Sequence, residues 1–311
     1  MQKAYITALY ELMLMDRNVV SLLSDSGTDY DALLARDFPE QCLNFGIAEQ
    51  NKVAAASGMA ALGKIPFVYT TGAFIAYRAY EFVRNDVCFQ NRNVKLCGMG
   101  MGMGSWSTLG ASHHTTEDIA ALRALPNLIL LSASTPIELQ KCVYAAYEIN
   151  GPVYIRMGMS GEKELYDETY DFQLGKLSRI IEGGDYAVFV TGTIIGEVAE
   201  VAMRLRDLGI SINVNNVHTL KPIDKVGIIE ATKSVYKVFT VEEHNVYGGL
   251  GGAVAEVLAE SGSSVPLVRI GLNDSFAYGY GTTAEVRRMN SLDTNGIFDK
   301  IYSEIVSSKC S

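Results

Sequence analysis

Several kinds of residue are scarce in this sequence, and each scarcity excludes a class of protein. Only five cysteines occur among 311 residues, and their odd number and irregular spacing fit neither a disulfide framework nor a set of zinc ligands. They stand at Cys42, Cys88, Cys97, Cys142 and Cys310. We therefore expect reduced thiols, mostly in the core of a cytoplasmic protein.

Basic stretches and long apolar segments are also lacking. Lysine and arginine number 26 against 35 acidic residues, and the net charge of −9, with no basic stripe, argues against a nucleic-acid partner. No segment reaches the roughly 18 uncharged apolar residues that a membrane helix needs. The first apolar run ends at Asp16 and Arg17 and shows no signal-peptide pattern. The sequence thus predicts a protein that engages neither membrane nor nucleic acid.

A large apolar fraction in a regular pattern is what the chain does have. Hydrophobic residues make up 48% and charged residues 20%, which permits a large buried core, and the length suits two domains. Strands separated by helices imply parallel pairing with right-handed crossovers. The first predicted strands span 18–25, 65–71, 93–100, 127–134 and 152–158. The first predicted helices span 4–15, 47–62, 74–89 and 115–125, and Pro136 opens a further one.

A second alternation of the same kind follows a polar, charged stretch. Its predicted strands span 186–192, 210–217, 237–243 and 265–271. Its predicted helices span 196–208, 224–233 and 250–260. We predict two doubly wound α/β domains, over residues 1–160 and 179–311, joined by a linker over residues 161–178.

The most informative motif is LNFGIAEQN at residues 43–51. It resembles the motif that opens the pyrimidine-binding domain of the transketolase family, and the glutamate of that motif corresponds to Glu49. The resemblance implies that Glu49 is a catalytic residue that also binds the cofactor. A carboxyl group that shares a proton with N1′ of thiamine diphosphate favours the imino tautomer, whose 4′-nitrogen removes the proton from the thiazolium carbon. Without the surrounding motif, Glu49 would be interpreted as an exposed glutamate of a first helical turn.

A second segment, PFVYTTGAFIAYRAYEFVR at residues 66–84, resembles the family's strand, stacking aromatics and Arg-Ala-aromatic-acid helix. The resemblance implies that Phe74 stacks on the aminopyrimidine ring of the cofactor. A second aromatic of the family is replaced by Thr71, and Tyr77 is the candidate to compensate for it. The cofactor-binding candidates are therefore Glu49, Phe74, Tyr77 and Arg78.

A third segment, GASHHTTEDIAALRALPN at residues 110–127, resembles the family stretch in which a histidine precedes a short helix ending in Leu-Pro-Asn. His113 takes the place of that histidine. The resemblance implies that His113 is a second catalytic residue, which hydrogen-bonds substrate oxygens and stabilises the charge that develops on them. Its neighbour His114 is better explained by a structural role.

The positions that bind a sugar phosphate in the family depart from its pattern. The resemblance places Met159 at an arginine, Met101 at a histidine, Asp29 at a serine, and Leu109 at an aspartate that contacts a substrate hydroxyl. Two apolar residues and a carboxylate do not bind a phosphate, so we expect a substrate that lacks a terminal phosphate or anchors it on a partner chain. The substrate-binding candidates are His113, Leu109 and Arg156, the arginine only if it turns inward to hold a phosphate.

A diphosphate-binding motif is missing. The family holds the diphosphate and its metal with Gly-Asp-Gly and an asparagine about thirty residues on, in the N-terminal half of full-length enzymes. Gly184, Asp185 and Asn215 imitate that spacing, but the third glycine is Tyr186 and the aspartate begins a strand. The chain thus resembles the C-terminal half of a split transketolase, the second of its two subunits. This implies a partner, the N-terminal half, that carries the motif and binds Mg²⁺ or Ca²⁺, in an α2β2 heterotetramer.

Two features of the second domain suggest a phosphate-binding loop and a metal site, and we reject both interpretations. The glycine-rich run 248–252 lacks the spacing of a phosphate-binding loop, so we interpret it as a tight turn into a helix. Glu242, Glu243 and His244 end a strand without metal-ligand spacing, and we assign no metal to this chain.

The leading hypothesis is a subunit that transfers a two-carbon ketol unit between sugar-like substrates, with thiamine diphosphate shared between two chains. An alternative is a beta-type subunit of a 2-oxoacid dehydrogenase or a decarboxylating synthase, which shares the architecture and the glutamate. Release of carbon dioxide would separate the two. A third hypothesis, a non-catalytic scaffold, is disfavoured by the joint presence of Glu49, Phe74 and His113.

Overall fold

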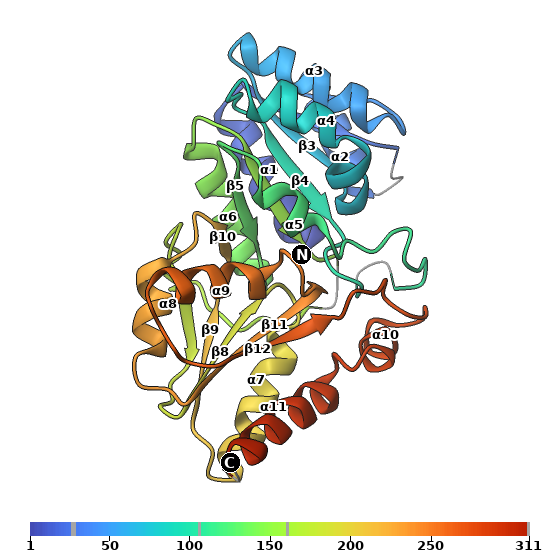
Figure 1. The fold of residues 1–311 in the computed structure, drawn as a ribbon. Helices are drawn as coiled ribbons and strands as arrows, with labels where there is room; N and C mark the ends of the chain where they lie inside the picture. The colour runs from blue at the N-terminus through green and yellow to red at the C-terminus, as the bar shows by residue number, and fades with distance from the viewer. Residues whose placement is uncertain (26–28, 105–106, 160–161, 310–311) are drawn as a thin grey trace.

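The computed structural model describes residues 1–25, 29–104, 107–159 and 162–309, which form two α/β parts stacked one above the other (Figure 1). The first part, blue to green, holds a seven-stranded sheet, and the second, yellow to red, holds a five-stranded sheet. The N-terminus lies near the boundary between the two parts, and the C-terminus lies at the far end of the second. Two doubly wound α/β units are thus confirmed.

The seven-stranded sheet has the order β10-β5-β6-β4-β3-β1-β2. Its strands are β1 (Val19–Leu23), β2 (Cys42–Asn44), β3 (Ile65–Thr71), β4 (Lys95–Met99), β5 (Ile129–Ser132), β6 (Val153–Met157) and β10 (Thr219–Lys221). Every pairing is parallel except that of β10, which runs antiparallel to β5. Strand β10 comes from the second part of the chain, a crossing that the sequence pattern did not predict.

The helices of the first part cover both faces of this sheet, which explains why β1, β4 and β6 are buried along their whole length. They are α1 (Gln2–Met15), α2 (Asp29–Asp37), α3 (Glu49–Ala61), α5 (Asp118–Arg123) and α6 (Pro136–Glu148). Helix α6 begins as predicted, because Thr135 accepts a hydrogen bond from the backbone N–H of Glu138 and proline occupies the first turn. The predicted helix over 74–89 is present but contains π-helical turns, as η1 (Phe74–Arg78), α4 (Tyr80–Phe82) and η2 (Val83–Cys88).

The five-stranded sheet has the order β12-β11-β8-β9-β7. Its strands are β7 (Ser178–Ile181), β8 (Tyr186–Thr191), β9 (Ile212–Asn216), β11 (Lys237–Asn245) and β12 (Leu267–Leu272), all parallel to their neighbours except β7. The helices of this part are α7 (Ile195–Asp207), α8 (Lys225–Thr232), α9 (Leu250–Glu260), α10 (Thr283–Met289) and α11 (Thr294–Lys309). Among the described residues, no helix combines the length and the hydropathy that crossing a bilayer requires.

The two parts share a hydrophobic core. One cluster of buried side chains includes Leu122 and Leu130 from the first part and Leu220 and Leu250 from the second. The stretch 162–177 between the parts carries no helix or strand but is packed, with the rings of Tyr166 and Tyr170 stacked 3.8 Å apart. The boundaries 160 and 179 stay a prediction, since β10 interlocks the two parts across them.

Candidate active site

The topology of the first sheet singles out one crevice. From β1 the chain runs outward to the edge strand β2, then returns past β1 to β3 and continues to β4 on the other side. Ligands of open α/β sheets bind at such a reversal, beyond the carboxyl ends of the strands. By this rule we expect the crevice beyond Leu23 and Thr71, where the hydroxyls of Ser24 and Thr70 are hydrogen-bonded to each other at 3.0 Å.

Glu49 lies at this crevice with its side chain only 1% exposed. It is the first residue of α3, where the exposed N–H groups of the helix favour a negative charge. Arg78 donates from Nη1 to Oε2 of Glu49 at 2.7 Å, and Thr70 donates from Oγ1 to Oε1 at 3.4 Å. Each oxygen of the carboxylate therefore has its own donor, one on a half-exposed arginine and the other on a buried threonine.

Phe74 and Arg78 lie one helical turn apart on η1. The guanidinium carbon of Arg78 is 4.4 Å from the centre of the Phe74 ring, within the range of a cation–π contact. The ring of His113 meets the same phenyl ring edge-on, with 5.3 Å between centroids. His113 also pairs through Nδ1 with the hydroxyl of Ser112 at 3.0 Å. The structure thus places Glu49, Phe74, Arg78 and His113 close together, while the roles assigned to them stay a prediction.

Tyr77 is hydrogen-bonded to Glu117, a contact that differs from the stacking role considered for it. Its hydroxyl donates to a carboxylate oxygen of Glu117 and accepts from the backbone N–H of Glu117, both at 2.9 Å. Glu117 is the N-cap residue of α5, so Tyr77 ties η1 to the start of that helix. The arrangement fixes the stretch that carries His113 relative to the helix that carries Phe74.

The substrate candidates lie in two different environments. Leu109 is half exposed, whereas Arg156 is 1% exposed and donates from Nε to Oδ2 of Asp118 at 2.9 Å. Arg156 also donates from Nη2 to the backbone carbonyls of Thr115 at 3.0 Å and Glu243 at 3.3 Å. This placement favours a structural role for Arg156 over the inward turn toward a phosphate.

The other residues that depart from the family pattern differ in how far they are buried. Met101 is buried and Met159 is partly buried, while the side chain of Asp29 lies outside the described residues. His114 is buried, in keeping with a structural role. These placements leave the expectation about the sugar phosphate a prediction.

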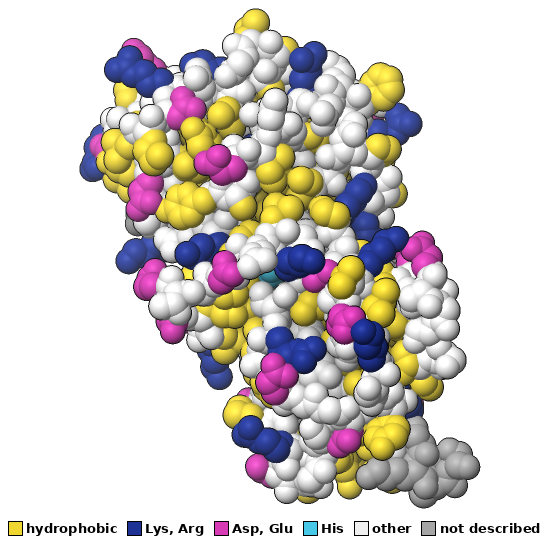
Figure 2. Space-filling model, turned by 90° about the vertical axis from the view of Figure 1, so that its left-hand side faces the viewer, with side chains coloured by type: hydrophobic (Ala, Val, Ile, Leu, Met, Phe, Trp, Pro, Cys, Tyr) yellow, Lys and Arg dark blue, Asp and Glu magenta, His cyan; other side chains and the backbone are white. Residues whose placement is uncertain are grey.

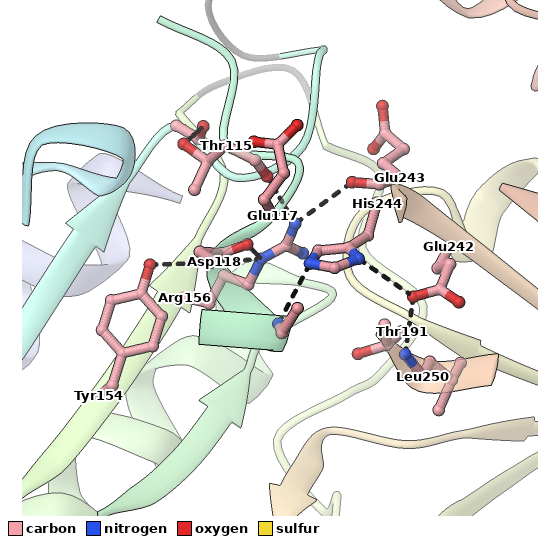
Figure 3. A network of polar contacts seen from close by, with 12 residues as sticks. Thr115, Glu117, Asp118, Tyr154, Arg156, Thr191, Glu242, Glu243, His244 and Leu250 are labelled. Carbon is pink, nitrogen blue, oxygen red and sulfur yellow. Dashed lines mark hydrogen bonds and ion pairs between the residues drawn. The ribbon is translucent and has the colours of Figure 1, made fainter. Parts of the chain in front are cut away.

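A polar network joins the carboxyl end of β11 to the first part of the chain (Figure 3). His244 donates from Nδ1 to the carbonyl of Asn245 at 2.6 Å and accepts at Nε2 from the N–H of Ala120 at 3.4 Å. Burial lowers the pKa of His244, which suits the neutral ring that this pattern requires. Asn245 in turn donates its N–H to the carbonyl of Thr116 at 2.8 Å.

Glu242 and Glu243 serve the same junction. Glu242 accepts from the N–H groups of Leu250 and Gly251 at 2.7 and 2.8 Å, and burial raises its pKa to about 7. The glycine-rich run therefore leads into α9 by a turn, as predicted, and Glu242 accepts hydrogen bonds from the first turn of that helix. Glu243 is ion-paired with Arg287 at 2.7 Å. Within the described residues, no group of three His, Cys, Asp or Glu side chains is placed to hold a metal ion.

Both parts of the chain match known family models. Residues 1–160 match the model "Transketolase, pyrimidine binding domain", and residues 175–297 match "Transketolase, C-terminal domain".

Three proteins match this chain along nearly the whole length of both and are described as a section, a subunit or a split-gene product. A putative transketolase C-terminal section of Methanocaldococcus jannaschii is 37% identical over 308 residues, which cover 98% of this chain and 96% of that protein. A subunit of the apulose-4-phosphate transketolase of Actinobacillus succinogenes is 34% identical over 287 residues, 92% of each chain. A solved structure described as a split gene transketolase, inactive beta4 tetramer, has a TM-score of 0.87 at 34% identity and covers 97% of this chain and 96% of its own.

Proposed function

The chain belongs to the transketolase family, and on that premise we propose that it is the pyrimidine-side subunit of a thiamine diphosphate-dependent transketolase. The enzyme would transfer a two-carbon ketol unit between sugar-like substrates in the cytoplasm. We also propose the domain boundaries 1–160, 161–178 and 179–311 for this subunit.

The observation that carries this proposal is that Arg78 contacts both Glu49 and Phe74. The guanidinium is planar, carries N–H donors, stacks near the phenyl ring and bonds the carboxylate. The aminopyrimidine of thiamine diphosphate is also planar and needs the same two partners, an aromatic face and a carboxyl group at N1′. The residues present therefore fit this group. Arg78 was a cofactor-binding candidate on the resemblance alone, and we propose instead that it contacts the same two partners until the cofactor binds.

The roles of the chain's own residues follow from their positions. When bound, thiamine diphosphate supplies a thiazolium carbon that carries the two-carbon unit between substrates. Glu49 would share a proton with N1′ through Oε2, once Arg78 has released that oxygen. Phe74 would support the pyrimidine ring. His113, whose ring meets the ring of Phe74 edge-on, would hydrogen-bond the oxygens of the substrate.

A second chain is needed to complete the site. We propose a partner of comparable size that carries the Gly-Asp-Gly…Asn motif and binds Mg²⁺ or Ca²⁺, in an α2β2 assembly. Around the candidate site Ile47 is 74% exposed, and Leu109 and Tyr77 are also exposed, so an apolar rim is available to be covered. The surface in Figure 2 carries hydrophobic side chains mainly over the upper part, with acidic and basic groups interspersed. A similar solved structure is described as a split gene transketolase, inactive beta4 tetramer, which agrees with the need for a partner.

Calorimetric titration of the protein with thiamine diphosphate and Mg²⁺ tests which of the two chains supplies the metal and diphosphate ligands. We expect weak binding to this chain alone and tight binding once the partner is added, because the described residues offer the metal no cluster of oxygen ligands. Tight, metal-dependent binding by the isolated chain would show that the metal and diphosphate ligands belong to it after all.

A further inference from the structure

A lysine that the sequence analysis passed over lies fully buried beside the candidate site. Lys52 follows Glu49 by three residues on α3, which puts the two side chains on one face of the helix. Its exposed fraction is 0%. Nζ donates to the hydroxyl of Ser24 and, at 2.9 Å, to the backbone carbonyl of Tyr69. Burial of an ammonium group is costly unless it is hydrogen-bonded, so this lysine is held by specific contacts at the crevice.

These contacts continue to the carboxylate of Glu49. Ser24 donates from Oγ to Oγ1 of Thr70 at 3.0 Å, and Thr70 donates from Oγ1 to Oε1 of Glu49 at 3.4 Å. Each hydroxyl accepts on its lysine side and donates on its glutamate side, so the chain has one direction from cation to anion. Hydrogen bonds in such a chain polarise and strengthen one another inside a protein.

The two oxygens of Glu49 are therefore held unequally. Oε1 is fixed from inside by Thr70, Ser24 and Lys52, whereas Oε2 is held by Arg78, whose side chain is 39% exposed. Arg78 can move away without disturbing the core, whereas Lys52 and Thr70 are buried and Ser24 between them is half-buried. This marks Oε2 as the oxygen offered to a ligand and Oε1 as the anchored one.

We propose that Lys52 is a positioning residue for the reaction, acting on Glu49 through Ser24 and Thr70; this rests on the function proposed above. The relay keeps the carboxylate in one orientation and balances its negative charge from the buried side while Oε2 shares a proton with N1′. Loss of the relay leaves the ring support at Phe74 in place, so it slows activation of the cofactor without abolishing its binding.

Three variants break or restore the relay. Lys52→Met removes the cation and keeps the length of the side chain, and Thr70→Val removes the hydroxyl and keeps the shape. Thr70→Ser restores a hydroxyl at the same position. The matched control is Lys95→Met, because Lys95 is also 0% exposed but lies at the start of β4, at the opposite end of the sheet. There it bonds Asn93 and the carbonyls of Ile149 and Gly151.

The measurements use the chain reconstituted with its partner. We expect exchange of the C2 proton of bound thiamine diphosphate, and kcat with it, to fall about 10- to 100-fold in Lys52→Met and Thr70→Val, as when outer partners of a site are removed. The dissociation constant of the cofactor stays close to that of wild type. Thr70→Ser recovers exchange relative to Thr70→Val, and Lys95→Met exchanges as wild type does. Wild-type exchange in Lys52→Met, or an equal loss in Lys95→Met, would overturn the proposal.

A second measurement needs no cofactor. In the full chain alone, the changes in Tm caused by Lys52→Met and Glu49→Gln are expected to be non-additive in the double variant, because the two groups are coupled. Thr70→Val combined with Glu49→Gln gives the same test if Lys52→Met does not fold. Additive changes would refute the relay. If wild-type pairs show no exchange above that of free cofactor, the proposed function fails, and this cycle still decides the relay.

Discussion

Replacement of Glu49 by glutamine separates the chemistry of the site from its stability. An amide keeps the shape of the side chain and can still hydrogen-bond N1′, but it cannot share the proton. Loss of a general acid–base group typically costs about 100- to 10,000-fold in rate. We therefore expect turnover by the reconstituted pair to fall by that factor in Glu49→Gln and to be lost in Glu49→Ala.

The cost to folding is expected to be much smaller. The ion pair with half-exposed Arg78 contributes about 0.2–1 kcal/mol, and the charge at the start of α3 contributes about 0.3–1 kcal/mol. The amide oxygen of glutamine can still accept the hydrogen bond from Thr70, so the loss is close to the sum of these two contributions. That sum, about 0.5–2 kcal/mol, lies within the usual stability of about 5–15 kcal/mol. The fall in Tm should stay below about 8 °C, so the variant remains folded while the rate is lost.

A buried glutamate elsewhere supplies the control. Glu138 is fully buried in the first turn of α6, a helix of 13 residues like α3, but it bonds Ser134, Tyr170 and Asn216 away from the site. Glu138→Gln should lower Tm without lowering kcat. Wild-type activity in Glu49→Ala, measured with the partner and saturating cofactor, would refute the assignment of Glu49.

Three further predictions concern Arg78, the substrate and pH. Arg78→Ala should tighten cofactor binding to the reconstituted pair by about 3- to 30-fold in calorimetry. The reason is that the ion pair and the cation–π contact of Arg78 no longer compete with the cofactor for Glu49 and Phe74. Weaker binding would mean that Arg78 holds the cofactor. Xylulose 5-phosphate and ribose 5-phosphate should give kcat/KM values below the usual ~10⁴ M⁻¹s⁻¹. Arg156→Ala should lower Tm, because it leaves Asp118 buried and unpaired. If the wild-type pair turned these sugars over efficiently and Arg156→Ala abolished that turnover, both statements would be wrong. Burial raises the pKa of Glu242 to about 7, so protonated Glu242 stabilises the fold in acid, and this contribution is lost as pH rises through about 7. The Tm of wild type minus that of Glu242→Gln should therefore shrink between about pH 5 and pH 8. A difference in Tm that does not change with pH would count against the raised pKa.

Local patterns predicted most of the regular elements. Strand β3 has the predicted bounds, Ile65–Thr71, and α9 has the predicted bounds, Leu250–Glu260, since both depend on nearby residues. The π-helical turns at Phe74–Arg78 were not predicted, because the hydrophobic pattern of that stretch also fits an ordinary helix.

Long-range pairing explains what the sequence did not reveal. Arg156 stands in an apolar strand, and only the fold shows that Asp118, 38 residues earlier, neutralises it. Lys52 lies in an alanine-rich helical stretch, where a lysine would ordinarily be assigned to the solvent face. Its link to Glu49 depends on Ser24, from another strand end. Strand β10 was missed for the same reason, since three residues carry no signal of a partner almost ninety positions away.

That short strand has a consequence for any fragment of the chain. Thr219–Lys221 covers the edge of β5, so a fragment that ends within the linker would leave a bare row of backbone donors and acceptors beside Leu130 and Leu131. Such an edge is a template for pairing with another chain, and the truncated first domain should self-associate rather than stay monomeric. Cleavage of the linker in the folded protein, by contrast, should leave the two pieces attached through β10. A gene split at the linker would therefore have to supply a new cover for the edge of β5.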